Sequence, residues 1–412
     1  MIALGFLISV RINYRICLTQ TTFFNFTLFD GATDHNQPAA WFTVDDNTGR
    51  LTARGHGTPE TTDHQVDLHE HYVMPGFFNV HTHVTLDPQS FSGDSGQSEA
   101  EAGVFAFENL QTLLKSGVTY VRELGTNYDV DVKLKRLQHR GLLPHTPHLL
   151  ASGRAFSMTG GHGDSPHGGH AVDSPDEMRK AVRTAFKHGV ETIKVMATGG
   201  VMTPNDFMED PQLSVAEMRV AVEEAHHKRR LVAAHAEGNP GIQNALDAGV
   251  DSIEHGFYVT ETEAKQMVAQ GTYLTPTLIA EWTIPEFGKG QLPDWEVKKA
   301  ADALDDTYVN LRRAYQLGVK FTCGTDAGTP FNGFDLTPAE FSLLAKLGMT
   351  PAQAYQCSSL NSAALLGVAD DYGTLEVGKF ADFQVLSADP LADTANVQQT
   401  DKHVYLSGKR EF

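Results

Sequence analysis

The chain has 412 residues, of which 41% are hydrophobic and 20% are charged, a globular balance at a length that suits a barrel and a smaller domain. The 51 acidic residues exceed the 32 basic ones and give a net charge of −19, which argues against nucleic acid or an anionic membrane as a partner. The three cysteines are widely spaced and form no Cys-x-x-Cys pair, which argues against a disulfide framework or a thiolate zinc site.

The first twenty residues form the first distinct segment. Residues 2–10 are an apolar run that no basic residue precedes, and the run is too short to span a bilayer. We interpret residues 1–20 as an N-terminal extension rather than a secretory signal. No later segment has transmembrane length, so we expect a cytoplasmic protein without a membrane partner.

The two ends of the chain beyond this extension are rich in strand patterns. Residues 21–73 alternate apolar and polar residues between turn formers, as in WFTVDDNTGRLTARG. Residues 370–412 return to short strands with glycine turns, as in DYGTLEVGKFADFQVL. We expect these two segments to form one composite β-sandwich domain that docks on residues 74–369.

The central segment, residues 74–369, alternates strand-like and helical runs. Amphipathic stretches such as SPDEMRKAVRTAFKHG begin at cap-forming residues and end at glycine. Between them, apolar runs end in polar residues: FFNVHTH, VTYVREL, HLLASGR, TIKVMA, LVAAHAE, DSIEHG, TYLTPTL and KFTCGTDAG. These strand–helix units predict an α/β fold, a (β/α)8 TIM barrel, in which the C-terminal ends of the strands carry the chemistry.

The first of these runs ends in His81 and His83. Residues two apart in a strand point to the same side, so both imidazoles face the mouth of the predicted barrel. Two imidazoles at one strand end supply half of a metal site, although a lone His-x-His pair is often incidental. Lys194 lies inside the fourth run, where a lysine is costly unless it is neutralised or modified.

Three further candidate ligands end later runs: His235 the fifth, His255 the sixth and Asp326 the eighth. Taken singly, each has a structural explanation, as a core histidine with satisfied nitrogens or as a turn aspartate. All of them nevertheless fall at strand ends of one predicted barrel, together with the candidates of the first and fourth runs. We therefore predict a metal site at the mouth of the barrel.

The sequence around these positions resembles the amidohydrolase superfamily. The resemblance rests on HTH at residues 81–83 after MPG, IKVMATGG around Lys194, EHG at residues 254–256 and GTD at residues 324–326. The closing run GTLEVGKFADFQVLSADPL is also similar to that superfamily. The context of Lys194 and the run TGGHG at residues 159–163 resemble the branch that contains prolidase-like dipeptidases and imidazolonepropionase-related hydrolases.

This resemblance implies two divalent metal ions, zinc in that branch, and a Lys194 that has added CO2 to become a carbamate bridging them. The histidine pair of the first run and Asp326 would complete one metal, and His235 and His255 the other. Two dications roughly 3.5–4 Å apart need such an anionic bridge and lower the pKa of a shared water. The bridging hydroxide would attack a polarised carbonyl, and Asp326 would carry its proton to the leaving nitrogen. Manganese and cobalt also suit these ligands.

Three residues are candidates for substrate contacts. His162 lies in the glycine-rich run TGGHGDSPHGGH, either as a catalytic contact to a substrate carbonyl or carboxylate, or as a solvated loop histidine. Arg154 ends the third run, where it either anchors a carboxylate or forms a structural salt bridge. Glu237 stands two residues after His235, where several relatives have a second histidine. It would repel a substrate carboxylate and favour a basic group.

We predict a metal-dependent hydrolase that cleaves the carbon–nitrogen amide bond of a small peptide or N-acyl amino acid. A lactonase or esterase with the same metals is one alternative. A cyclic-amide hydrolase or deaminase is another, although Lys194 argues against it. The non-enzyme alternative is an inactive metal-bearing scaffold, although no expected ligand is missing. The expected partner is a small-molecule substrate, and a homo-oligomer stays open because relatives often associate.

Overall fold

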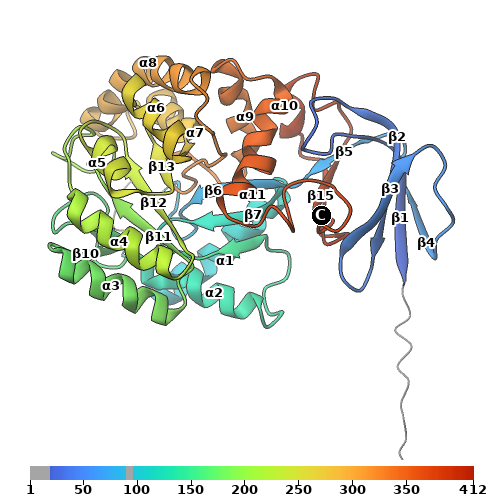
Figure 1. The fold of residues 1–412 in the computed structure, drawn as a ribbon, viewed down its shortest axis with the longest axis horizontal. Helices are drawn as coiled ribbons and strands as arrows, with labels where there is room; N and C mark the ends of the chain where they lie inside the picture. The colour runs from blue at the N-terminus through green and yellow to red at the C-terminus, as the bar shows by residue number, and fades with distance from the viewer. Residues whose placement is uncertain (1–18, 90–95) are drawn as a thin grey trace, which may run out of the picture.

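The computed structural model describes residues 19–89 and 96–412, and Figure 1 shows a central α/β body with a β domain at one end. Residues 1–18 of the predicted N-terminal extension lie outside the described residues. The first strand, β1 (Gln20–Leu28), begins at the residue where the extension was predicted to end. Within the described ranges, none of the helices is long and apolar enough to cross a membrane.

The strands of the central body form two sheets in which all paired neighbours are parallel. One sheet has the order β6-β7-β8 and the other the order β10-β9-β11-β12-β13-β14. Their bounds are β6 (Phe77–Thr82), β7 (Val118–Glu123), β8 (His148–Leu150), β9 (Ala155–Ser157), β10 (Gly169–Ala171), β11 (Thr192–Met196), β12 (Leu231–Ala236), β13 (Ser252–His255) and β14 (Tyr273–Thr275). All the predicted runs except the last coincide with one of these strands, and β9 and β10 bracket the glycine-rich loop.

Hydrogen bonds join the two sheets at both edges. On one side, the backbone amide of Thr192 in β11 donates to the carbonyl oxygen of Ala151, just after β8, at 3.3 Å. On the other side, residues 320–327 pair with β14 through Leu274 and with β6 through Thr82. The result is a TIM-barrel-like fold with an additional β domain.

The eighth predicted run, residues 320–328, does not form a regular strand. Asp326 has a φ of 58°, in the left-handed region that an extended strand does not use. The backbone amides of Thr325 and Asp326 both donate to the carbonyl oxygen of His81, at 3.3 and 2.8 Å. This irregular pairing ends the segment beside the histidines of β6, and it reflects a backbone turn that residue periodicity does not predict.

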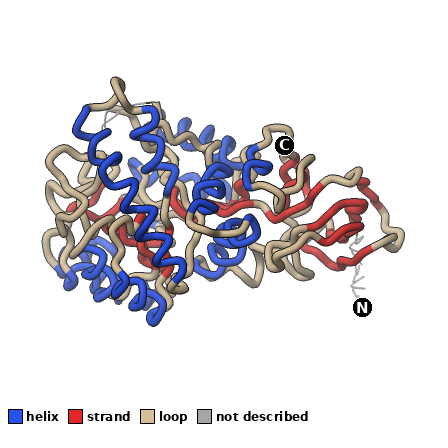
Figure 2. The backbone as a smooth tube through the Cα atoms, turned by 90° about the horizontal axis from the view of Figure 1, so that it is seen from above, coloured by secondary structure: helices blue, strands red, loops and turns tan. Residues whose placement is uncertain are grey.

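Helices surround these strands on the outside (Figure 2). They are α1 (Glu99–Lys115), α2 (Val130–Gln138), α3 (Pro175–His188), α4 (Val215–His227), α5 (Gly241–Ala248), α6 (Glu261–Gln270), α7 (Leu278–Phe287), α8 (Asp294–Gln316), α9 (Thr337–Lys346), α10 (Pro351–Gln356) and α11 (Ser362–Leu365), with shorter turns η1 (Asn127–Asp129), η2 (Cys357–Asn361) and η3 (Thr394–Gln398). Capping boxes begin α1, α4 and α6 at Ser98, Ser214 and Thr260. Each side chain accepts a hydrogen bond from a backbone amide that would otherwise be unpaired.

Gly324 lies where the eighth predicted run, residues 320–328, approaches β6 closely. A Cβ atom at residue 324 would lie 2.7 Å from the Cβ of His81. We expect Gly324→Ala to lower the free energy of unfolding by about 1–3 kcal/mol, the usual cost of overpacking. Gly103→Ala is the control, because Gly103 lies inside α1 with open space around it. Thermal unfolding compares the two variants, and equal melting temperatures would contradict the close approach.

The β domain is built from both ends of the chain. Its sheet has the order β17-β16-β15-β5-β1-β2-β3, and β4 also pairs with β1. Besides β1, its strands are β2 (Gln37–Asp45), β3 (Arg50–His56), β4 (His64–Asp67), β5 (Tyr72–Pro75), β15 (Phe383–Leu386), β16 (His403–Leu406) and β17 (Lys409–Arg410). The two ends meet at β5, which is parallel to β1 and antiparallel to β15.

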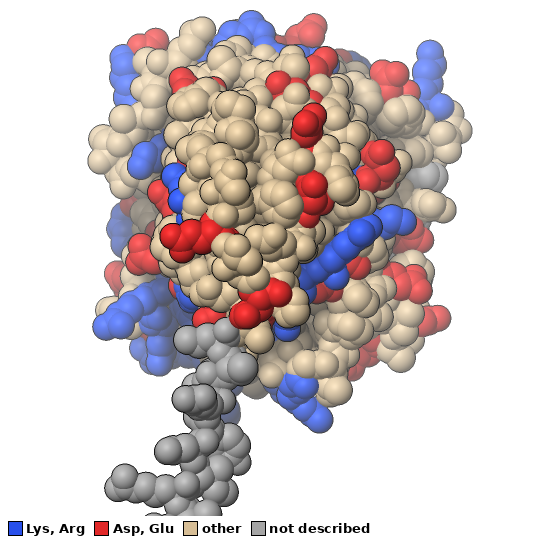
Figure 3. Space-filling view, turned by 90° about the vertical axis from the view of Figure 1, so that its right-hand side faces the viewer, with Lys and Arg blue, Asp and Glu red and all other residues tan. Residues whose placement is uncertain are grey.

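An aromatic cluster fills the inside of this sheet. The rings of Phe23 in β1 and Phe383 in β15 lie 5.1 Å apart between centroids, although β5 separates the two strands. Phe383 also stacks on Tyr405 at 4.3 Å. One hydrogen-bonded sheet therefore curls around its own core, where the sequence predicts a sandwich. On this end of the molecule acidic and basic side chains are interspersed, and much of the surface is uncharged (Figure 3).

Candidate metal centre

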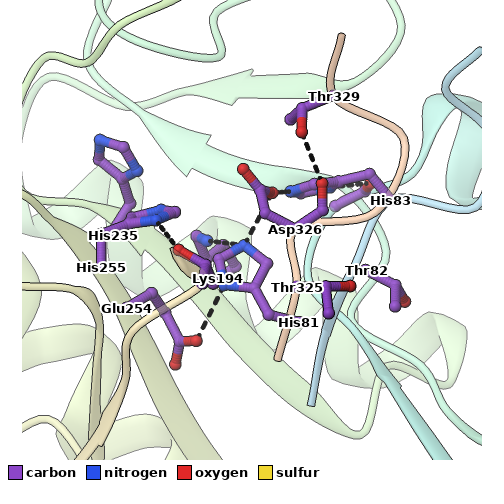
Figure 4. A network of polar contacts seen from close by, with 12 residues as sticks. His81, Thr82, His83, Lys194, His235, Glu254, His255, Thr325, Asp326 and Thr329 are labelled. Carbon is purple, nitrogen blue, oxygen red and sulfur yellow. Dashed lines mark hydrogen bonds and ion pairs between the residues drawn. The ribbon is translucent and has the colours of Figure 1, made fainter. Parts of the chain in front are cut away.

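The predicted ligands come together where the parallel strands end (Figure 4). Oδ1 of Asp326 lies 3.2 Å from Nε2 of His81 and 3.0 Å from Nε2 of His83. Nζ of Lys194, from β11, lies 3.2 Å from Nε2 of His81. Because His81 and His83 are two residues apart, both side chains lie on the same side of the chain and reach Asp326, as the strand period predicts.

Ligand atoms gather in two groups, and the members of each group lie within 4.8 Å of one another. The first group is His81, His83 and Asp326, and the second is His235, Glu237 and His255. Glu237 is predicted from the sequence to touch substrate, whereas the structure places its carboxyl among the candidate ligands. The rings of the two groups are in contact, because the centroids of His81 and His255 are 5.0 Å apart.

Hydrogen bonds behind the histidines decide which nitrogen faces the site. Nδ1 of His81 lies 2.9 Å from Oε2 of Glu254, and Nη2 of Arg122 donates to the other carboxylate oxygen, Oε1, at 2.8 Å. An Nδ1–H that donates to a carboxylate leaves the lone pair on Nε2, the arrangement that ligating histidines require. Burial would raise the pKa of Glu254, but Arg122 and His81 hold it well below its usual range. Glu254 is therefore a buried anion that orients His81.

The other imidazoles are oriented in the same way. Nδ1 of His83 lies 2.9 Å from the carbonyl oxygen of Gly125, so this nitrogen donates. Nε2 of His235 lies 2.9 Å from the carbonyl oxygen of Gly199, which leaves the lone pair of this ring on Nδ1. Nδ1 of His255 lies 2.7 Å from the hydroxyl oxygen of Thr277, and that hydroxyl donates to the Pro276 carbonyl. Each of these rings thus carries its lone pair on the nitrogen that does not donate.

Charge around the site also suits divalent cations. Burial, followed by the charges of neighbouring groups, lowers the pKa of His235 and of His255 well below its usual value, so both rings are neutral. Burial would raise the pKa of Asp326, but His81 and His83 hold it well below its usual range. Neutral imidazoles and carboxylates are the donors that such metals bind, so the residues fit the metals that the resemblance implies.

Glu237 supplies the clearest sign that a group is needed at the second cluster. Its side chain is buried, and its Oε2 has no hydrogen-bond partner among the described residues. Burial, and then the charges of Glu281 and Asp326, raise the pKa of Glu237 well above its usual range. A cation between Glu237 and the two histidines would satisfy this oxygen, which otherwise costs free energy in a buried place.

His162 contacts the second cluster. Its ring stacks on His235 with centroids 4.5 Å apart, and its Nδ1 lies 3.1 Å from Oδ2 of Asp206. The ring also approaches Gly200 so closely that a Cβ there would lie 2.6 Å from it. His162 thus lies at the site, as one of the two sequence-based alternatives expects, and Asp206 orients it.

Arg154 is not brought to the site. Its Nε lies 3.5 Å from Oδ1 of Asp129, and it is absent from the residues that line the cavity around the candidate ligands. Because Asp129 draws the guanidinium away, the geometry favours the structural salt bridge over the carboxylate anchor that the sequence also allowed.

A cavity of about 620 Å³ opens over both ligand groups, within the usual size of a small-molecule site. Its lining includes His162, Lys194, Glu281 and Trp295. Glu254, Asp206 and Glu281 were not predicted from the sequence as site residues. For Glu254 a signal existed, because it is a charged residue inside a predicted strand, as Lys194 is.

We expect Glu254→Gln to weaken metal binding about 10- to 100-fold, the usual effect of removing a partner behind a ligating histidine. The amide is a weaker acceptor for the Nδ1–H of His81 than the carboxylate. Metal titration of the purified variant measures the loss. Glu223→Gln, at an exposed position of α4, is the matched control. Unchanged metal affinity in Glu254→Gln would remove Glu254 from this orienting role.

The chain matches the Amidohydrolase family over residues 72–410. It is 30% identical over 368 residues to an ochratoxinase from Aspergillus niger, covering 82% of this chain and 75% of that protein. It is 25% identical over 361 residues to an imidazolonepropionase from Cutibacterium acnes, covering 79% of this chain and 78% of that protein. A solved Xaa-Pro dipeptidase with methionine bound in its active site has a TM-score of 0.86 and 29% identity, covering 95% of this chain and 99% of that one.

The family match extends over both ligand groups and the segments between them. Enzymes of this family generally bind divalent metals and act on small molecules, in agreement with the two candidate ligand groups and the cavity above them. The chain therefore belongs to the amidohydrolase family and is a hydrolase that acts on carbon–nitrogen bonds.

Proposed function

We propose that this enzyme hydrolyses the amide bond of a small peptide or N-acyl amino acid with the help of two divalent cations, zinc being our first choice. The observation that carries the proposal is the convergence of two ligand groups and Lys194 on one cavity. The similarity to a Xaa-Pro dipeptidase supports a peptide-like substrate, and the similarity to an imidazolonepropionase supports carbon–nitrogen hydrolysis more broadly.

The two cations would be held by the two groups of ligands. His81, His83 and Asp326 would hold one, and His235 and His255 the other, with Lys194 as a carbamate between them. When bound, such a pair of cations lowers the pKa of a shared water to near neutrality and polarises a carbonyl group. The carboxyl of Glu237 lies close enough to the second pair of histidines to join it.

Lys194 has the environment that carbamate formation needs. Burial lowers the pKa of its ammonium to about 8, although Glu254 and Asp326 partly oppose that change. Part of the lysine is therefore a neutral amine near pH 7, the form that can attack CO2. A nitrogen–carbon bond forms, one carbon–oxygen π bond opens to leave an anionic oxygen, and the nitrogen releases a proton. The product replaces a buried cation by an anion between the two ligand groups.

Two residues would handle protons and substrate. Asp326 is a carboxylate in the lining of the cavity, where it would take the proton of the attacking water and return it to the leaving nitrogen. His162, held by Asp206 at 3.1 Å, would contact the substrate carbonyl or carboxylate. Its glycine-rich surroundings let the backbone approach the substrate closely.

We also propose a division of the chain into two working parts. Residues 21–73 and 370–412 would form one β domain, and residues 74–369 the catalytic (β/α)8 barrel. The pairing of Val73 with Val385 across β5 and β15 supports this division, because it ties the two ends of the chain into one sheet.

The test combines metal content with hydrolysis. Metal per chain is measured in the purified protein, and release of free amino acid is followed for a panel of dipeptides and N-acyl amino acids. We expect two ions per chain and turnover of one subset. Two ions without turnover would refute the amide proposal and favour esters, lactones or cyclic amides. Fewer than two ions, after zinc and bicarbonate are added, would refute the dinuclear centre.

A further inference from the structure

Two acidic side chains that belong to neither ligand group also line the cavity. Glu281 comes from α7 and Glu296 from the first turn of α8, and both line the same cavity as the candidate ligands. Their exposed fractions are only 2% and 5%. Among the described residues, neither forms an ion pair with a lysine or arginine, although a paired cation is the usual way to retain a buried acid.

Glu281 has the stronger need for a partner. Its Oε1 is buried without a hydrogen bond to any described residue, and burial raises the pKa of its carboxyl well above the usual range. The rest of α7 is largely apolar, with the sequence LIAEWTIPEF. Packing alone would favour an apolar side chain at this position, so a donor that enters through the cavity is the natural partner for the carboxyl.

The protein's own nearby cation is occupied elsewhere. Nζ of Lys299 donates to the carbonyl oxygens of Gly200 and Thr203 at 3.2 and 2.9 Å, and to that of Asp206. It acts on Glu296 only through its charge. Burial, which Lys299 partly opposes, raises the pKa of Glu296 to about 7. The two glutamates therefore keep their capacity to accept hydrogen bonds from a ligand.

The cavity lining beside these carboxyls is aromatic. Phe257 and Trp295 both line the cavity, and Nζ of Lys299 already lies 5.0 Å from the centroid of the Trp295 ring. Aromatic faces attract organic cations. Resting on the proposed function, we propose that Glu281 and Glu296 form a cation subsite that binds an ammonium or guanidinium group of the substrate. The enzyme would then prefer substrates that carry a positive charge, either at a free α-amino group or on a basic side chain.

The test is calorimetric titration of the full chain, as purified, with small amino acids, because binding does not depend on turnover. Arginine against citrulline reports on a charged side chain, and norleucine against hexanoate, which has no amide bond to cleave, reports on a free α-ammonium group. We expect the charged member of at least one pair to bind about tenfold or more tightly, as a charge-assisted hydrogen bond provides. The pair that shows the preference identifies the source of the cation.

Variants then assign the preference to the subsite. Glu281→Gln should reduce the charged-over-neutral ratio to near one, and Glu296→Gln should reduce it in part. Glu286→Gln is the matched control, because Glu286 is exposed on the same helix, α7. If circular dichroism shows that Glu281→Gln is misfolded, the comparison rests on Glu296→Gln.

Equal affinities within both pairs, or a preference that survives in the folded variants, would overturn the cation subsite. Its failure is distinct from failure of the proposed function. A protein that prefers the charged ligands yet cleaves no amide would lose the hydrolase proposal and retain the subsite. A protein that cleaves amides without any charge preference would retain the hydrolase proposal and lose the subsite.

Discussion

Replacement of Lys194 by alanine is expected to abolish the dinuclear site and nearly all hydrolysis. Lys194 is buried between the two ligand groups, with its Nζ 3.2 Å from Nε2 of His81. Without the proposed carbamate, two like charges would face each other with no anion between them. Loss of a hydrogen-bond partner behind a ligand already lowers metal affinity about 10- to 100-fold. We expect loss of Lys194 itself to lower metal affinity by more than that range. Metal content and kcat/KM measure the two effects.

The control for this variant is Lys187→Ala, at an exposed position of α3, which should retain metal and activity. Full activity in a folded Lys194→Ala variant would rule out the bridge. The bridge also predicts dependence on CO2. Activity of the wild-type protein after metal removal should recover only when bicarbonate accompanies the metal, and recovery without it would contradict a carbamate.

Asp326→Asn is expected to retain much of the bound metal and to lower turnover by about 10²- to 10⁴-fold, the usual contribution of a general acid–base group. The amide keeps an oxygen towards His81 and His83, whose Nε2 atoms lie within 3.2 Å of the carboxylate, but it cannot take a proton. The measurement pairs kcat with metal content, so that loss of chemistry is separated from loss of ligand.

Asp335→Asn is the matched control, because Asp335 is exposed in the loop before α9. Turnover that stays unchanged in Asp326→Asn would remove this residue from proton transfer. Loss of both metal and turnover would reduce its role to that of a ligand.

Short-range patterns in the sequence were sufficient to predict a barrel-like body and to bring most of the candidate ligands together, although Glu237 was predicted to contact substrate and lies among those ligands. The alternation of apolar and polar residues predicts on which side of its own strand a residue lies, and this placed His81 and His83 together. The succession of strand and helix runs predicted a barrel-like body, and in such a fold the strand ends meet. His235 and His255 follow from that rule.

Contacts between elements distant in the chain were decided only by the tertiary structure. Glu254 meets Arg122 and His81 because β6, β7 and β13 pack around one interior, and no local period contains that information. Arg154 could turn either towards the cavity or towards Asp129, and packing selected Asp129. The left-handed turn at Asp326 likewise depends on pairing with β6.

The same reason explains why the pair Glu281 and Glu296 was not predicted. Each residue alone has the appearance of an ordinary helical glutamate, one in α7 and one in α8. Only the packing of both helices over the strand ends buries them in one cavity. Sequence periodicity determines the face of a residue on its own element, whereas burial and partners arise when separate elements come together.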